Sequence, residues 1–165
     1  MRILATLLAV ALATSVFAGP EVGKPAPEFT LKDLSGHMQK LQKEFVDKGV
    51  VWLSICSSAP GKQGNETPDA AKSGFAQFGS AATAYLVDGE GKVGRLYNAK
   101  TTPEMYVVNP EGVLIYAGAI DDKPTPDPST VAGSNNYVKA ALNEATSGKT
   151  VSVPSTKPYG CSVKY

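Results

Sequence analysis

The sequence of 165 residues predicts a single α/β domain in which helices flank a mixed central sheet. Continuous apolar runs of strand length alternate along the chain with segments of helical periodicity. Two further apolar runs, Met105–Val108 and Val113–Ala117, flank the turn sequence NPEG, a pattern typical of a β-hairpin. Hydrophobic residues make up 42% of the chain and charged residues 19%, which is ordinary for one globular domain.

The first 18 residues are expected to be a secretory signal peptide. Arg2 precedes an apolar run, and Val16 and Ala18 are the small residues that cleavage before Gly19 requires. An uncleaved membrane anchor is the alternative, but the run is short for a spanning helix. We therefore expect an exported protein, periplasmic or secreted, with no membrane segment after cleavage.

Local patterns predict the elements of the first half. Phe29–Leu31 alternates apolar and polar residues and indicates a short strand. The helix that follows places Met38, Leu41 and Phe45 on one face and ends at Gly49. The continuous apolar run that comes next is expected to be a strand covered on both faces; it is Val50–Ile55.

The second half predicts a helix, a strand, the hairpin and a last helix. Thr67 and Pro68 suit the N-cap and the first position of a helix, and Thr83–Asp88 predicts a buried strand. The last helix ends at Gly148, and its apolar face is expected to hold Val138, Ala141, Leu142 and Ala145. We place the domain at residues 19–148 and treat 149–165 as an extended C-terminal tail.

Charge and composition exclude several classes of partner. Lys and Arg together number 16 and Asp and Glu 15, without a basic stripe, which argues against nucleic acid and anionic membranes. With one histidine, His37, and two distant cysteines, Cys56 and Cys161, we expect no metal site and no other cofactor. In an oxidising compartment the two cysteines are candidates for a disulfide.

Two stretches resemble the thioredoxin-like redoxins of the alkyl hydroperoxide reductase and thiol-specific antioxidant type. They are VGKPAPEFTLKDLSG and YLVDGEGKVGRLYNAKTTPEMYVVNPEGVLIYAGAID, and the ending KPYGCSVKY is similar to that of a group of exported redoxins. The resemblance covers most of the mature chain and implies a thioredoxin-like fold. It also implies a thiol-dependent oxidoreductase or peroxidase that acts on a peroxide or a disulfide and is recycled by a thiol reductant.

The sequence departs from that family where the reactive cysteine is expected. In the family, DLSG leads to a central strand and then to the cysteine, whereas here Gly36 is followed at once by HMQKLQKEFVDKGVVWLSI. We favour an alignment in which the segment with the central strand is absent, so that the active site is degenerate. In a second alignment Val50–Ile55 is the central strand and Cys56 stands near the active-site position.

Loss of a central strand leaves unpaired backbone groups in the core. Either Val50–Ile55 takes the central place, or the domain is marginal in stability, or a second chain completes it in a homodimer.

Five residues are candidates for the site. Cys56 directly follows a strand and is the candidate nucleophile, against the alternative of an inert or disulfide-bonded residue. The resemblance implies that Cys161 is the resolving cysteine. It also implies that Pro103, after Thr102, is a cis proline whose loop presents backbone groups to the substrate. Arg95 is a candidate to stabilise the thiolate, against a plain surface position.

Other conspicuous residues are interpreted more simply. Asp121-Asp122 is an acid pair or, more simply, a solvated strand end; His37 is expected on the surface and Trp52 in the core.

Three functions are compatible with these residues. The first is an exported thiol oxidoreductase with Cys56 and Cys161 as its dithiol. The second is a non-catalytic thioredoxin-like module that binds a partner near Pro103. The third is a truncated gene product that folds poorly.

Overall fold

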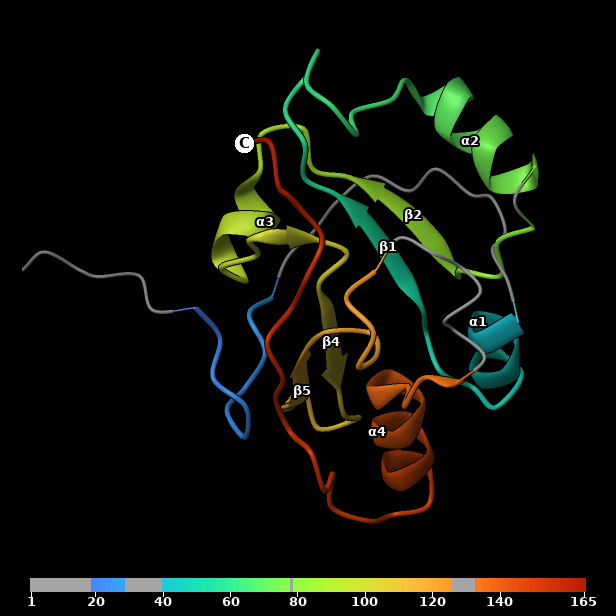
Figure 1. Cartoon of the computed structure of the whole chain (residues 1–165), viewed down its shortest axis with the longest axis vertical. Helices are drawn as coiled ribbons and strands as arrows, with labels where there is room; N and C mark the ends of the chain where they lie inside the picture. The colour runs from blue at the N-terminus through green and yellow to red at the C-terminus, as the bar shows by residue number, and fades with distance from the viewer. Residues whose placement is uncertain (1–18, 29–39, 78, 126–132) are drawn as a thin grey trace, which may run out of the picture.

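The computed structural model describes residues 19–28, 40–77, 79–125 and 133–165. The predicted signal peptide, the predicted strand Phe29–Leu31 and His37 lie outside them. The described chain is a mixed α/β structure of the thioredoxin-like type (Figure 1). In chain order its elements are α1 (Lys40–Val46), β1 (Leu53–Cys56), α2 (Pro68–Gln77), β2 (Ala84–Val87), α3 (Lys92–Leu96), β3 (Thr101–Thr102), β4 (Met105–Val108), β5 (Leu114–Gly118), α4 (Tyr137–Thr146) and β6 (Cys161–Ser162).

The turn after α1 and the start of α2 lie at the residues that the sequence predicts. Gly49 closes the turn after α1 with a φ of 86°. The hydroxyl oxygen of Thr67 accepts a hydrogen bond from the amide of Ala70 at 3.2 Å, and Pro68 is the first residue of α2. Because these signals act within a few residues, local sequence is enough to fix them.

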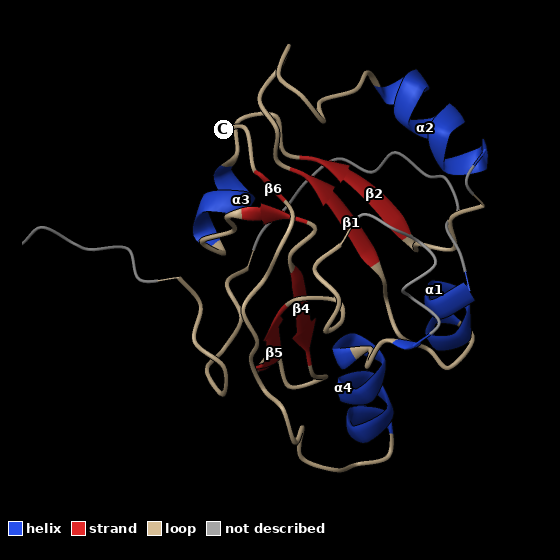
Figure 2. Cartoon of the chain, in the orientation of Figure 1, coloured by secondary structure: helices blue, strands red, loops and turns tan. Residues whose placement is uncertain are grey.

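The strands form three separate pairs in place of one continuous ladder. β1 and β2 are parallel, β4 and β5 form the predicted antiparallel hairpin, and β3 pairs with β6 (Figure 2). Among the described residues, neither β1 nor β4 pairs with a second strand. The point after Gly36 at which the sequence predicts a missing strand lies outside the described residues.

The core lies where the hairpin packs against α1 and α4. Phe45 of α1 and Tyr116 of β5 are fully buried. The apolar face of α4 is buried as predicted at Val138, Ala141 and Leu142. Trp52 packs against this core from the segment before β1 and is half-buried, in agreement with its expected place.

The expectation that the Val50–Ile55 strand is covered on both faces is wrong. Leu53 and Ile55 alternate along β1, so their side chains lie on one face, and they are 41% and 37% exposed. Val51, two residues before β1 in the same alternation, is 67% exposed. The described helices that pack on strands contact β4 and β5 instead. The face of the sheet to which these side chains point is therefore left open by the described residues.

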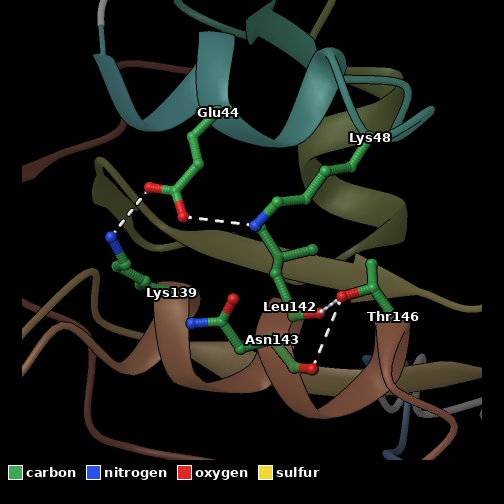
Figure 3. Close-up of polar contacts among 6 residues, drawn as sticks. All are labelled: Glu44, Lys48, Lys139, Leu142, Asn143 and Thr146. Carbon is green, nitrogen blue, oxygen red and sulfur yellow. Dashed lines mark hydrogen bonds and ion pairs between the residues drawn. The ribbon is translucent and has the colours of Figure 1, made fainter.

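A polar contact joins the outer surfaces of α1 and α4 (Figure 3). The carboxylate of Glu44 accepts hydrogen bonds from Lys139 at 2.7 Å and from Lys48 at 3.2 Å. Lys139 first, and then Lys48, lower the pKa of Glu44. All three side chains are substantially exposed, so the cluster orients the two helices more than it stabilises them.

Residues 154–165, here called the C-terminal strap, run in extended form along the hairpin and end near α3 (Figure 1). The amide of Ala117 donates to the carbonyl of Pro154, and the amide of Thr156 donates to that of Ala117, both at 3.1 Å. Gly118 allows this approach, because a Cβ there would lie 2.4 Å from the Thr156 carbonyl oxygen. Further along, Tyr159 donates a hydrogen bond to the buried carboxylate of Asp121.

Replacing core and exposed apolar residues tests this packing. Phe45→Ala is expected to lower the free energy of unfolding by about 3–5 kcal/mol, because it opens a cavity in the core. Val51→Ala, on the exposed row that continues along β1, is expected to change it by less than about 0.5 kcal/mol. Urea unfolding of the mature chain measures both. A loss of several kcal/mol for Val51→Ala would show that the row is covered.

Tyr159→Phe is expected to reduce the loss of stability at alkaline pH. Burial first, and then the hydrogen bond and charge of Asp121, raise the pKa of Tyr159 to about 12. An unfolded tyrosine ionises near about pH 10, so the contribution of Tyr159 is complete below that pH and is lost as the pH rises towards 12. Unfolding free energies across this interval measure the difference between the two proteins. Parallel curves would contradict the assignment.

Candidate functional site

Cys56 is the last residue of β1, and its thiol is half-buried. The chain turns after it into a loop, and the sulfur donates a hydrogen bond to the carbonyl oxygen of Gly64 at 3.2 Å. A carbonyl oxygen accepts a hydrogen from a thiol but has none to give to a thiolate. The loop therefore offers the Cys56 sulfur an acceptor and not a donor.

Tyr85 supplies the donor that the loop does not. In the β1–β2 register Ser54 is opposite Tyr85 and Cys56 is opposite Val87, so Tyr85 and Cys56 share one face of the pair. Burial first, then a hydrogen bond with Cys56 and the charges of Cys56 and Glu66, raise the pKa of Tyr85. Its hydroxyl thus stays protonated and can donate to a Cys56 thiolate. Sequence reasoning missed Tyr85, because its position depends on strand register.

A buried carboxylate fixes the chain directly after Cys56. Asp88 is 2% exposed and accepts hydrogen bonds from the hydroxyl of Ser57 at 2.8 Å and from the amide of Gly94 at 2.9 Å. The end of β1, the end of β2 and α3 are joined through this one group. The direction in which the chain leaves Cys56 is set by Asp88.

The peptide bond between Thr102 and Pro103 is cis, as the sequence predicts. The loop around it is held by Glu104, whose carboxylate accepts hydrogen bonds from the amides of Lys100 at 2.8 Å and of Thr101 at 3.2 Å. β3 therefore presents a defined backbone edge immediately before the proline.

Cys161 lies on that edge. In the antiparallel pair of β3 and β6, Cys161 is opposite Thr102 and Ser162 is opposite Thr101. The side chain of Cys161 is exposed, and its thiol, like that of Cys56, is free. Three of the predicted site residues, Cys161, Thr102 and Pro103, are thus brought together, although they are distant in sequence.

The end of the strap reaches the segment that follows Cys56. The amide of Ala59 donates to the carbonyl of Lys164 at 2.7 Å. A Cβ on Gly94 would lie 2.6 Å from the hydroxyl of Tyr165 and 2.7 Å from the Ser57 side chain. The chain after Cys56 and the chain after Cys161 therefore contact the same side of α3.

Arg95 holds the strap. Its guanidinium lies 4.4 Å from the centre of the Tyr165 ring and donates to the carbonyl of Glu90. Neither contact is to a cysteine, and the side chain is exposed on α3.

The two acids of the Asp121-Asp122 pair have separate partners. Asp121 is buried and accepts from Tyr159, whereas Asp122 accepts from the side chain and the backbone amide of Asn135. These bonds with Asn135 lower the pKa of Asp122. Both acids act as anchors for neighbouring chain segments.

Two kinds of feature are absent from the part of the chain that the structure describes. No helix there is long and apolar enough to cross a membrane. The same residues contain no group of three or more metal-ligating side chains.

Known proteins are similar to this chain in sequence and in fold. No family model matches it. The thiol:disulfide interchange protein DsbE of Allochromatium vinosum is 29% identical, over 62% of this chain and 70% of that protein. An uncharacterized conserved protein of Geobacillus kaustophilus superposes with a TM-score of 0.72 at 22% identity, over 88% of this chain and 92% of the other. A hypothetical protein of Sinorhizobium meliloti gives 0.69 at 20% identity, over 90% and 96%. The two structures share the fold of this chain.

Proposed function

We propose that this chain is an exported thiol:disulfide oxidoreductase in which Cys56 and Cys161 form the redox pair. The observation that carries the proposal is the position of Cys161, a free and exposed thiol opposite Thr102 and next to the cis proline. The relative in Allochromatium vinosum is named for disulfide interchange, which supports the same chemistry.

Cys56 is the attacking residue in this proposal. Its thiol first leaves the carbonyl of Gly64 and loses its proton to solvent, and the hydroxyl of Tyr85 then donates to the thiolate. The thiolate attacks a substrate disulfide, so that a mixed disulfide forms and one substrate sulfur leaves as a thiolate.

Cys161 completes the exchange. Its thiolate attacks the Cys56 sulfur of the mixed disulfide, a Cys56–Cys161 bond forms, and the second substrate thiolate leaves. The substrate gains two electrons and the protein loses two, which an external thiol reductant restores. For this step Cys56 must give up its hydrogen bond to the carbonyl of Gly64.

We propose that the site is degenerate. The hydrogen bond that Cys56 donates to a carbonyl supports this, because a site that stabilises a thiolate needs hydrogen-bond donors. We therefore propose slow exchange, with disulfides of proteins or small molecules as the main substrates and peroxides as the second class.

A non-catalytic binding module is the second candidate. The exposed apolar row of Val51, Leu53 and Ile55 favours it, because such rows on a free strand mark interaction surfaces. A homodimer is one way to cover that row.

Alkylation and intact mass separate the two candidates. The reduced mature protein receives one equivalent of oxidised glutathione or, separately, of hydrogen peroxide, and is then quenched with an alkylating agent. The wild-type protein is expected to lose two alkylation sites. Cys161→Ser is expected to stop at a glutathione adduct on Cys56, and Cys56→Ser is expected to react much more slowly.

The outcomes assign the function. Full alkylation of both cysteines after every treatment would contradict the oxidoreductase and favour the binding module. Reaction with peroxide alone would assign a peroxidase. A disulfide between two chains would place the redox pair in a homodimer.

N-terminal sequencing of the recovered protein tests export and cleavage. The N-terminus of the protein recovered from outside the cytoplasm is expected to be Gly19, because Val16 and Ala18 form the cleavage signal. Full-length protein retained with the membrane would contradict cleavage.

A further inference from the structure

The C-terminal strap covers the strand edge beside the cis proline. β6 occupies the edge of β3, and the amide of Val163 extends the pairing with a 3.0 Å hydrogen bond to the carbonyl of Lys100. These are backbone contacts of the kind that any extended chain can make. An incoming strand would have to replace the strap in order to pair with Thr102.

The close approach of the strap to β3 requires a glycine at position 160. A Cβ on Gly160 would lie 2.2 Å from the carbonyl oxygen of Thr102 and 2.9 Å from its carbon. The φ of Gly160 is 136°, a backbone conformation that residues with side chains rarely adopt. The edge therefore accepts an extended segment in which glycine directly precedes the residue opposite Thr102, which in the strap is Cys161.

Anchors on both sides keep the strap in place. Tyr159 and Asp121 hold it before β6. After β6, Tyr165 donates to the carbonyl of Ala99 at 2.7 Å and packs on Arg95. Because both anchors belong to the same chain, the strap has a high effective concentration at the edge.

We propose that the strap is a built-in competitor for the substrate. It occupies the edge of β3 at rest, and an extended Gly-Cys segment of a protein substrate pairs with Thr102 when the strap leaves. This inference rests on the proposed function, because it names the segment of a protein substrate that would bind before disulfide exchange. The binding step itself involves no redox chemistry.

Binding of a synthetic peptide to the full mature chain tests the proposal. The probe is a fluorescent copy of residues 157–165 in which serine replaces the cysteine, and anisotropy reports its binding. Gly160→Ala is expected to bind it at least about tenfold more tightly than the wild type, because the competing strap is displaced. Gly133→Ala is the matched control, since a Cβ there meets no atom within 4 Å.

A second peptide, with alanine in place of the glycine, is expected not to bind. Equal affinity of Gly160→Ala and Gly133→Ala for the first peptide would overturn the proposal, and so would equal binding of the two peptides. If circular dichroism shows that Gly160→Ala does not fold, Tyr165→Ala is used in its place. It removes the anchor at the end of the strap and is also expected to bind the first peptide more tightly than the wild type. Neither peptide has a thiol, so peptide binding is measured separately from disulfide exchange. If the peptide binds but the alkylation experiment shows no exchange, only the proposed function is contradicted. If exchange occurs but the peptide does not bind, only this inference is contradicted.

Discussion

The antiparallel pairing of Cys161 with Thr102 is the contact on which the candidate site depends. β1 and β4 do not pair with each other, so the two halves of the described sheet lack a shared ladder. The strap bonds to the hairpin through Ala117, to β3, and to the loop after β1 through Ala59. Each such hydrogen bond contributes about 0.5–1.5 kcal/mol to the free energy of unfolding. Because one bond alone is weak, the two halves are joined by all of these contacts together.

The same contact sets the chemistry. It places one thiol beside the cis proline, while the other thiol, Cys56, remains at the end of β1 with the carbonyl of Gly64 as its acceptor. Tyr85 lies on the same face of the β1–β2 pair as Cys56, and burial first, then its interaction with Cys56, raise the pKa of Tyr85. In the structure both thiols are free, Cys56 at the end of β1 and Cys161 on the strap.

Local signals predicted much of this structure and long-range pairing explains what they missed. The cap at Thr67, the turn at Gly49, the hairpin and the cis bond before Pro103 each depend on a few neighbouring residues. The exposed row was missed because an apolar run does not show whether a helix covers each face of the strand. The pairing of β6 with β3 was missed because two-residue strands have no periodicity, although Gly160 beside Cys161 marks the close approach.

Hydrogen exchange of individual backbone amides tests most directly that the strap is held in this position. Ala59, Ala119 and Val163 each donate an amide hydrogen across the contact between the strap and the rest of the chain. These three amides are expected to exchange much more slowly than in an unstructured peptide, and to lose protection together, because they report one docked segment. Exchange of all three at the unstructured rate would show that the strap is undocked and would contradict its proposed role.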